Sequence, residues 1–85
     1  MNKVKDGSVK IEEQIAIAFS EILHVPLNFD RCKSFIQLGG QSIAAAKLQI
    51  RLVEMLGVRV PYATIFENGT VSELAEIIFS EEEKG

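Results

Sequence analysis

Residues 39–56 read GGQSIAAAKLQIRLVEML, and this stretch decides the fold. The run after Ser42 consists mainly of good helix formers, and Ser42 itself belongs to the preferred N-cap types. One apolar stripe recurs in this run at helical spacing, formed by Ala45, Leu48, Leu52 and Met55 or Leu56. Because Gly57 is a plausible C-terminal stop, we expect a helix over residues 42–56.

The same periodicity predicts another helix before this stretch. Its apolar face consists of Ile11, Ile15, Phe19, Ile22 and Leu23. Pro26 cannot continue such a helix, so we expect it over residues 8–23. Residues 1–7 are polar and lack periodicity, and we expect them to form a flexible leader.

Two further helices are expected after Gly57. Pro61 can occupy the first turn of a short helix over residues 62–66. Thr70 and Glu73 match a capping box, in which each side chain accepts a backbone N–H of the first turn, so a helix is expected over residues 71–80. Residues 81–85 (EEEKG) are then expected to form an acidic, solvated tail.

The segment from His24 to Gln41 has neither a helical nor a strand period. Loops of this length without structure of their own are usually functional. Four apolar residues are expected to hold this loop to the core, namely Phe29, Phe35, Ile36 and Leu38. The expected fold is all-α. It is a small four-helix bundle with three longer helices, one short helix and a long loop between the first two helices, and it forms one domain over residues 8–80.

Composition limits the possible functions. The chain has 85 residues, 47% of them hydrophobic, and a net charge of −3, which predicts one small domain that acts through its surface. Residues 1–66 carry eight Lys/Arg and six Asp/Glu (net +2), while residues 67–85 carry one Lys and six Glu (net −5). Without a basic stripe, nucleic-acid binding is disfavoured. One Cys and one His cannot form a zinc site, and no apolar run is long enough to span a membrane. We therefore expect a cytoplasmic protein.

The pair Gly39-Gly40 shortly before Ser42 departs from ordinary bundle sequence. Such glycines mark positive φ angles or a close approach of another molecule. On spacing alone, the simpler interpretation is a turn into a helix that Ser42 caps. A hydrolytic serine would need a base, yet the one histidine, His24, lies at a helix end, and the G-x-S-x-G pattern is absent. We expect no catalytic and no metal-binding residue in this chain.

The segment Leu38-Gly39-Gly40-Gln41-Ser42-Ile43 resembles the L-G-G-x-S-[LI] signature of peptidyl carrier (thiolation) domains of nonribosomal peptide synthetases. Phe35-Ile36 stands where these domains have a hydrophobic pair. Val60-Pro61, residues 65–67 (IFE) and residues 70–75 (TVSELA) are similar to their downstream V-P, [IL]-F-E and T-[VI]-x-x-L-A pattern. The resemblance covers about residues 9–79 and outweighs the interpretation of Ser42 as a cap alone.

The resemblance implies that Ser42 is the covalent attachment point of 4′-phosphopantetheine, transferred from coenzyme A by a separate, Mg²⁺-dependent phosphopantetheinyl transferase. A phosphodiester at a helix N-terminus agrees with the positive end of the helix dipole. Gly39 and Gly40 would leave the transferase access to the hydroxyl. The chain itself would be no enzyme. It would be a monomer that carries amino-acid or peptide thioesters between adenylation, condensation and thioesterase or reductase domains.

Partner domains are expected on the flank of the 42–56 helix. The resemblance places Ile43 in contact with partners, Lys47 lies one turn further on, and Tyr62 and Ile65 are secondary candidates. Such contacts would be weak, since a carrier must leave each partner.

Two alternatives stay open. Acyl carrier proteins of fatty acid or polyketide synthesis share the fold and the modified serine, but they typically read D-S-L and have a strongly acidic second helix. Here residues 42–56 carry Lys47, Arg51 and Glu54, a net charge of +1. The other alternative is an unmodified helical protein-interaction module in which Ser42 is only a cap. Departures from the family pattern at Lys33-Ser34, Gln41 and Gly69 leave the subfamily and the partners open.

Overall fold

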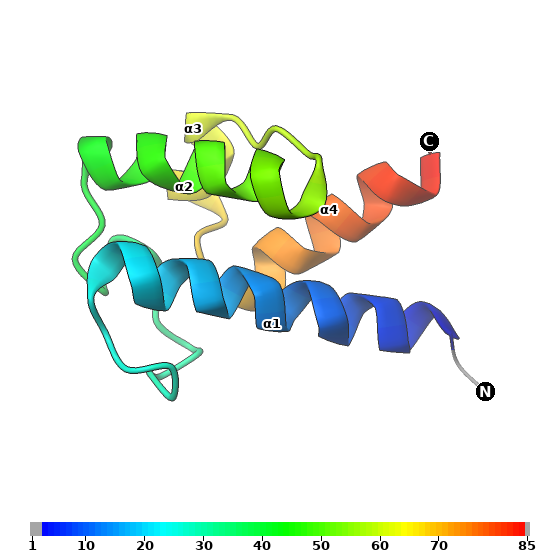
Figure 1. Cartoon of the computed structure of the whole chain (residues 1–85), viewed down its shortest axis with the longest axis horizontal. Helices are drawn as coiled ribbons and strands as arrows, with labels where there is room; N and C mark the ends of the chain where they lie inside the picture. Colours follow the sequence, from blue (N-terminus) through cyan, green and yellow to red (C-terminus); the bar gives the residue numbers. More distant parts are fainter. Residues whose placement is uncertain (1–2, 85) are drawn as a thin grey trace.

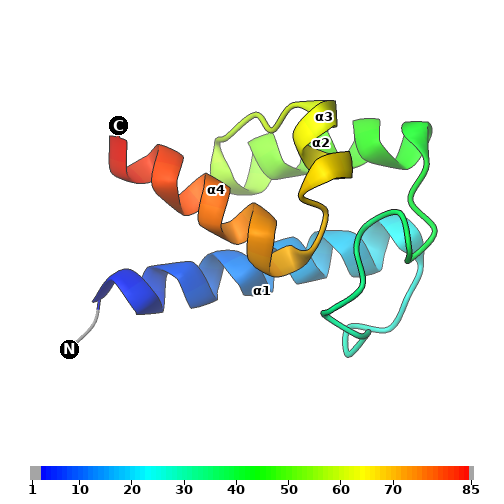
Figure 2. The ribbon, with the colours of Figure 1, turned by 180° about the vertical axis from the view of Figure 1, so that it is seen from behind.

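A computed structural model describes residues 3–84 of the chain, and every regular element in that range is a helix. The elements are α1 (Lys3–Leu23), α2 (Ser42–Leu56), α3 (Tyr62–Glu67) and α4 (Val71–Lys84). Figure 1 shows α2 running alongside α1 in the opposite direction. The view from behind in Figure 2 shows the short α3 in front of α2, with which it is in contact. The expected all-α four-helix bundle is confirmed.

The start of α2 lies at one end of this bundle, together with the end of α1 and the long loop (Figure 1). The start of α1 and the end of α4 both lie toward the opposite end, apart from each other (Figure 1). The segment that carries Ser42 is therefore presented away from the two ends of the described chain.

Local signals explain the helix boundaries. The bounds of α2 are those predicted, and Gly57 ends it with φ 71° while its N–H donates to the Val53 carbonyl at 2.9 Å. The short helix α3 follows Pro61 and runs one residue further than predicted. At the start of α4, the Thr70 N–H donates to Glu73 Oε1 and the Glu73 N–H donates to Thr70 Oγ1, both at 3.2 Å. The predicted capping box is confirmed.

The predicted bounds of two helices are wrong at their outer ends. α1 begins at Lys3 rather than near residue 8, and α4 continues to Lys84 rather than ending near residue 80. Helix propagation is easier than nucleation, and a single glycine, here Gly7, costs only about 1 kcal/mol relative to Ala. No proline or capping signal stops either helix at the predicted residue. The remaining residues of the expected leader and tail, 1–2 and 85, lie outside the described residues.

The core is formed by the apolar faces of α1, α2 and α4, of which the first two were predicted, together with buried side chains of the loops and of α3. Burial of one large aliphatic or aromatic side chain is worth about 1.5–3 kcal/mol, so this cluster is the main source of stability. The largest fully buried side chains are Phe19, Phe35, Ile15, Leu48, Leu52, Ile65, Leu74, Ile78, Val60 and Val71.

An aromatic cluster attaches the long loop to α1. The Phe19 ring stacks on Phe29 at a centroid distance of 5.9 Å and meets Phe35 edge-on at 5.2 Å. Leu38 is partly buried against the same core. The prediction for Ile36 is wrong, because its side chain is 52% exposed. Residues 35 and 36 lie on one hydrogen-bonded turn, so consecutive side chains point in different directions and only Phe35 faces the core.

Within residues 3–84, no helix is both long and apolar enough to cross a membrane.

Candidate functional site

The backbone before Ser42 forms a compact turn that sequence periodicity did not reveal. The Leu38 N–H donates to the Ser34 carbonyl at 3.0 Å, which closes one turn of helical type. Ser34 and Gln37 cap its start, because the Ser34 N–H donates to Gln37 Oε1 at 2.8 Å and the Gln37 N–H donates to Ser34 Oγ at 3.2 Å. This is the S-x-x-Q form of a capping box, a signal that was readable in the sequence.

Gly39 and Gly40 end this turn. The Gly39 N–H donates to the Ile36 carbonyl at 3.0 Å and the Gly40 N–H donates to the Phe35 carbonyl at 2.8 Å, which is the hydrogen-bond pattern of a Schellman motif. Gly39 stands at the position that needs a positive φ and has φ 104°. A side chain would be strained there although the space around it is open.

Gly40 has a different reason to be glycine. It is buried, and a Cβ at this position would overlap the Phe35 ring and lie 2.7 Å from the Phe35 carbonyl oxygen. Each glycine thus has a structural role of its own, a backbone angle for Gly39 and close packing for Gly40. Access for a transferase stays a prediction for both.

Ser42 is the first residue of α2 rather than its N-cap, so the predicted capping role is wrong. The N-cap is Gln41, whose backbone is extended (φ −123°, ψ −175°) and whose carbonyl accepts the Ala45 N–H at 2.8 Å. The N–H groups of Gly39 and Gly40 are hydrogen-bonded within the preceding turn, and Gln41 is the residue that follows this turn and precedes α2. The Gln41 side chain makes no capping hydrogen bond.

The Ser42 side chain is exposed. Among the described residues, its hydroxyl has no hydrogen-bond partner. The first turn of α2 contains no acidic residue, so it places no carboxylate of its own beside its free N–H groups and the positive end of the helix dipole. A phosphodiester on Ser42 would meet a favourable field, and these residues fit a covalently attached phosphopantetheine.

A base for Ser42 is not found in the hydrogen-bond pattern of residues 3–84. His24 is exposed and has φ 58°, a left-handed conformation that ends α1. That placement agrees with its predicted position at a helix end. Among the described side chains, no group of three or more His, Cys, Asp or Glu could hold a metal ion.

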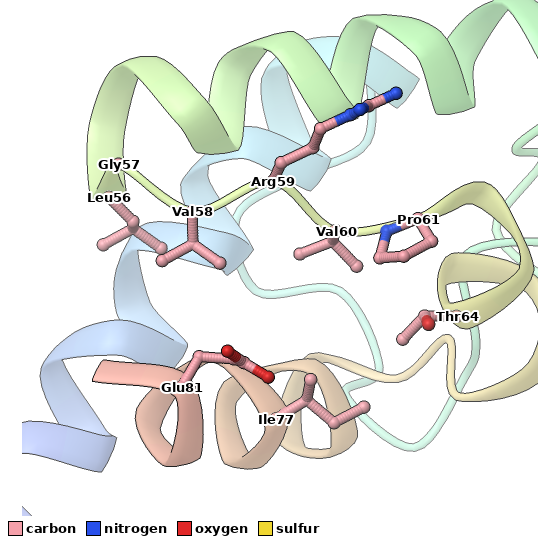
Figure 3. A pocket seen from close by; sticks show the side chains of 9 residues that line it. All are labelled: Leu56, Gly57, Val58, Arg59, Val60, Pro61, Thr64, Ile77 and Glu81. Atoms are coloured by element: carbon pink, nitrogen blue, oxygen red, sulfur yellow. The ribbon is translucent and has the colours of Figure 1, made fainter. Parts of the chain in front are cut away.

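Figure 3 shows a hollow of the structure that Ser42 does not line. It is formed by the end of α2, the α2–α3 link and α4, and its lining residues are Leu56, Gly57, Val58, Arg59, Val60, Pro61, Thr64, Ile77 and Glu81. Ser42 begins α2 and this hollow lies where α2 ends, so the candidate attachment residue is not among the residues that line it.

The outer flank of α2 carries the candidate contact residues. Ile43 is 74% exposed, Lys47 one turn further on is exposed, and Ile50 and Val53 extend this apolar surface along the helix. Val53 was missed by the sequence analysis, although its spacing from Ile50 places the two on neighbouring turns. Arg51 does not belong to the free surface, because its guanidinium pairs with Glu21 at 3.0 Å and with Glu54 at 3.5 Å.

Of the two contact residues predicted on the short helix α3, only one is exposed. Tyr62 is 49% exposed, in agreement with a contact role. Ile65 is fully buried, so the prediction that it contacts partners is wrong. A helix of six residues that lies on the core must turn one face inward, and Ile65 stands on that face.

Comparisons with known proteins identify the family of the chain. The family described as "Phosphopantetheine attachment site" matches residues 13–78. The chain is 41% identical over 66 residues to a dimodular nonribosomal peptide synthase of Bacillus subtilis (strain 168), with 76% of the chain and 3% of the relative covered. It is 40% identical over 67 residues to a linear gramicidin synthase of Brevibacillus parabrevis, with 78% of the chain and 1% of the relative covered.

A solved structure shows the same fold. The structure of McyG A-PCP complexed with phenylalanyl-adenylate matches with a TM-score of 0.72 and 32% identity, over 80% of this chain and 10% of that one. The chain thus spans only a few per cent of the length of the first relatives. Proteins of the matched family bind 4′-phosphopantetheine covalently and are generally non-catalytic. The chain belongs to the phosphopantetheine attachment site family and is a carrier domain of the nonribosomal peptide synthetase type.

Proposed function

We propose that Ser42 is the residue that carries 4′-phosphopantetheine, and that the chain holds amino-acid or peptide intermediates as thioesters for the domains of a nonribosomal peptide synthetase. The observation that carries this proposal is the free, exposed Ser42 hydroxyl at the first position of α2, within the segment Leu38-Gly39-Gly40-Gln41-Ser42-Ile43. When bound, the group supplies a terminal thiol to which the cargo is esterified.

The chain's own contribution is to present Ser42. The Schellman turn and the buried Gly40 hold the backbone on one side of Ser42, and α2 holds it on the other. The N–H groups of the first turn stabilise a phosphate charge attached there. A separate transferase would supply the base, which is why an exposed serine without an internal partner suits this role.

The proposal includes a non-catalytic role for the chain, supported by the generally non-catalytic character of the family. An adenylation domain is the best supported partner, because the similar solved structure is an A-PCP protein with phenylalanyl-adenylate. The phosphopantetheinyl transferase and the condensation, thioesterase or reductase domains remain predictions, as do the monomeric state and the cytoplasmic location.

Partner domains would contact the exposed flank of α2 through Ile43 and Lys47, with Tyr62 of α3 beside them. All three side chains are exposed. Among the large hydrophobic side chains that the structure describes, that of Ile43 is the most exposed. An apolar residue next to the reactive hydroxyl would let a partner bury surface close to the point where chemistry occurs.

The acyl carrier alternative is not supported. Its acidic second helix is absent, because α2 has Lys47 and Arg51 against Glu54 and a net charge of +1. The relatives named above are peptide synthetases.

Intact-protein mass spectrometry tests the proposal. Incubation with coenzyme A, Mg²⁺ and a broad-specificity phosphopantetheinyl transferase is expected to add the mass of one phosphopantetheine, and Ser42→Ala is expected to abolish this addition. Ser72→Ala is the matched control, since Ser72 is also an exposed serine in the first turn of a helix. A wild-type chain that stays unmodified would refute the proposal and favour the interaction-module alternative. A Ser42→Ala chain that is still modified would refute Ser42 as the attachment residue.

A further inference from the structure

Phe35, a buried residue of the long loop, is hydrogen-bonded to the backbone just before α2 and just before α4. We propose that Phe35 is a positioning residue for the loading of Ser42, because it determines where the start of α2 lies. This inference rests on the proposed function of Ser42. It assigns to Phe35 a role beyond that of a core residue.

The ring of Phe35 is anchored in the core. It is fully buried and packs edge-on against Phe19 of α1, with an angle of 68° between the rings. Phe19 is itself fully buried. The position of Phe35 is therefore determined by α1, the longest helix of the domain.

The backbone of Phe35 joins the entries of two helices. Its N–H donates to the Gly69 carbonyl at 2.8 Å, just before α4, and its carbonyl accepts the Gly40 N–H at 2.8 Å, just before α2. Segments that are far apart in the sequence are thus held together through one residue. Phe35, Gly40 and Gly69 are all buried, so these hydrogen bonds cannot easily be exchanged for water.

Both glycines fit closely around Phe35. A Cβ on Gly40 would overlap the Phe35 ring, and a Cβ on Gly69 would lie 3.3 Å from the Phe35 nitrogen and 2.7 Å from the Ile65 carbonyl oxygen. Gly40 precedes Ser42 by two residues, with only the extended Gln41 between them. Because the ring packs closely against Gly40 and the Phe35 carbonyl accepts the Gly40 N–H, we expect a displacement of Phe35 to move Gly40 and, through it, the Ser42 hydroxyl.

Small displacements of a reacting group have large kinetic effects, since a shift of about 1 Å can reduce a rate by about a hundredfold. Phe35 touches neither the transferred group nor the surface on which we expect the transferase, because it is fully buried. Its substitution should therefore reduce the kcat of transfer, while the KM for the carrier stays nearly constant.

The test compares Phe35→Leu with Phe29→Leu. Phe29 also packs on Phe19, but it makes none of the contacts with Gly40 or Gly69. Both proteins are assayed well below their melting temperatures with coenzyme A and the transferase. We expect Phe35→Leu to lower kcat by about tenfold with KM within about twofold, and Phe29→Leu to change both by less than about twofold. Equal kcat values for the two variants would overturn the inference.

Amide hydrogen exchange of the unloaded protein gives an independent readout. We expect the Gly40 amide to exchange at least about tenfold faster in Phe35→Leu than in Phe29→Leu, relative to amides in the middle of α4. Unchanged exchange at Gly40 would also overturn the inference. If Phe35→Leu does not fold, Phe35→Met and Phe29→Met take the place of this pair, because the flexible methionine side chain fills a core site at lower cost.

The two proposals fail in different ways. A wild-type chain that the transferase leaves unmodified refutes the role of Ser42, and the exchange measurement then still decides whether Phe35 holds the start of α2. A wild-type chain that is modified, together with unaffected Phe35 variants, refutes only the positioning role.

Discussion

The helices α2 and α4 begin in similar surroundings, but their first turns are capped differently. Each helix is entered through a glycine that contacts Phe35, Gly40 before α2 and Gly69 before α4. At α4, the Thr70 and Glu73 side chains bond the backbone N–H groups and each other. At α2, the N-cap residue Gln41 makes no such bond, and the first turn has no acidic residue.

The difference separates a structural helix start from a functional one. The α4 start satisfies its own N–H groups and carries its own negative charge, so it has little to offer a bound anion. The α2 start leaves its N–H groups and the Ser42 hydroxyl available. A capping box that would stabilise α2 is absent at the one place where an external phosphate is proposed to attach.

The largest effect on stability is expected from Gly40→Ala. The new Cβ would overlap the Phe35 ring, and because overpacking of a core costs about 1–3 kcal/mol, we expect a loss of about 3 kcal/mol in urea unfolding. Gly69→Ala, whose closest contact would be a 2.7 Å approach to the Ile65 carbonyl oxygen, is the matched substitution at the other helix start. We expect it to cost less, about 1 kcal/mol. A Gly40→Ala chain as stable as the wild type would contradict the close packing at the α2 entry.

Removal of the Thr70–Glu73 capping box at the start of α4 should have a smaller effect on stability. Thr70→Ala deletes the oxygen that accepts the Glu73 N–H at 3.2 Å, and loss of such an N-cap costs about 1 kcal/mol. The midpoint of thermal unfolding should fall accordingly, while phosphopantetheine transfer to Ser42 should stay at the wild-type rate. A reduced transfer rate at temperatures where the variant is fully folded would show that the Thr70–Glu73 cap also contributes to the presentation of Ser42.

A new capping side chain at the start of α2 should increase stability. Gln41→Asp places a preferred N-cap residue at a position that already has extended backbone, and we expect a gain of about 0.5–1 kcal/mol in urea unfolding. The same substitution at Gln37 should not stabilise the protein, since the Gln37 side chain already caps the preceding turn together with Ser34. No gain for Gln41→Asp would mean that the α2 start is already satisfied and that the contrast with α4 is smaller than its geometry indicates.

The smallest effect on stability is expected on the exposed flank of α2. Ile43→Glu should change the free energy of unfolding by less than about 0.5 kcal/mol, because the side chain is 74% exposed. It should nevertheless slow loading by an adenylation domain, since it places a charge in the expected contact. Ile50→Glu, which lies two turns further from Ser42, is the matched control and should slow loading less. Equal rates for both variants and the wild type would contradict a contact surface centred near Ser42.

Much of the fold was predictable because helical periodicity and capping are local properties. The bounds of α2, the buried stripe from Ala45 to Leu52 and the Thr70–Glu73 box all follow from residues a few positions apart. The turn over residues 34–40 was equally local. It was missed because it is shorter than the window in which periodicity can be recognised, although its S-x-x-Q start was readable.

Side-chain exposure was less predictable. Ile36 and Ile65 are both apolar residues within the recognised motif pattern, yet Ile36 points outward and Ile65 is buried. The direction of each side chain depends on which face of its turn meets the rest of the bundle. This face is determined by contacts with residues distant in sequence. The sequence therefore suggested Ile65 as a contact residue, although the fold buries it.

From its sequence alone, this chain could be assigned its helices, its apolar faces and the serine that matches the attachment motif, because these are encoded in the order and spacing of neighbouring residues. Tertiary structure alone decided that Gln41 rather than Ser42 enters the helix, that the Ser42 hydroxyl has no partner among the described residues, and that Gly40 and Gly69 are both fitted around Phe35. Those features arise where the long loop meets α1, α2 and the start of α4, and they depend on the packing of segments that no local pattern brings together.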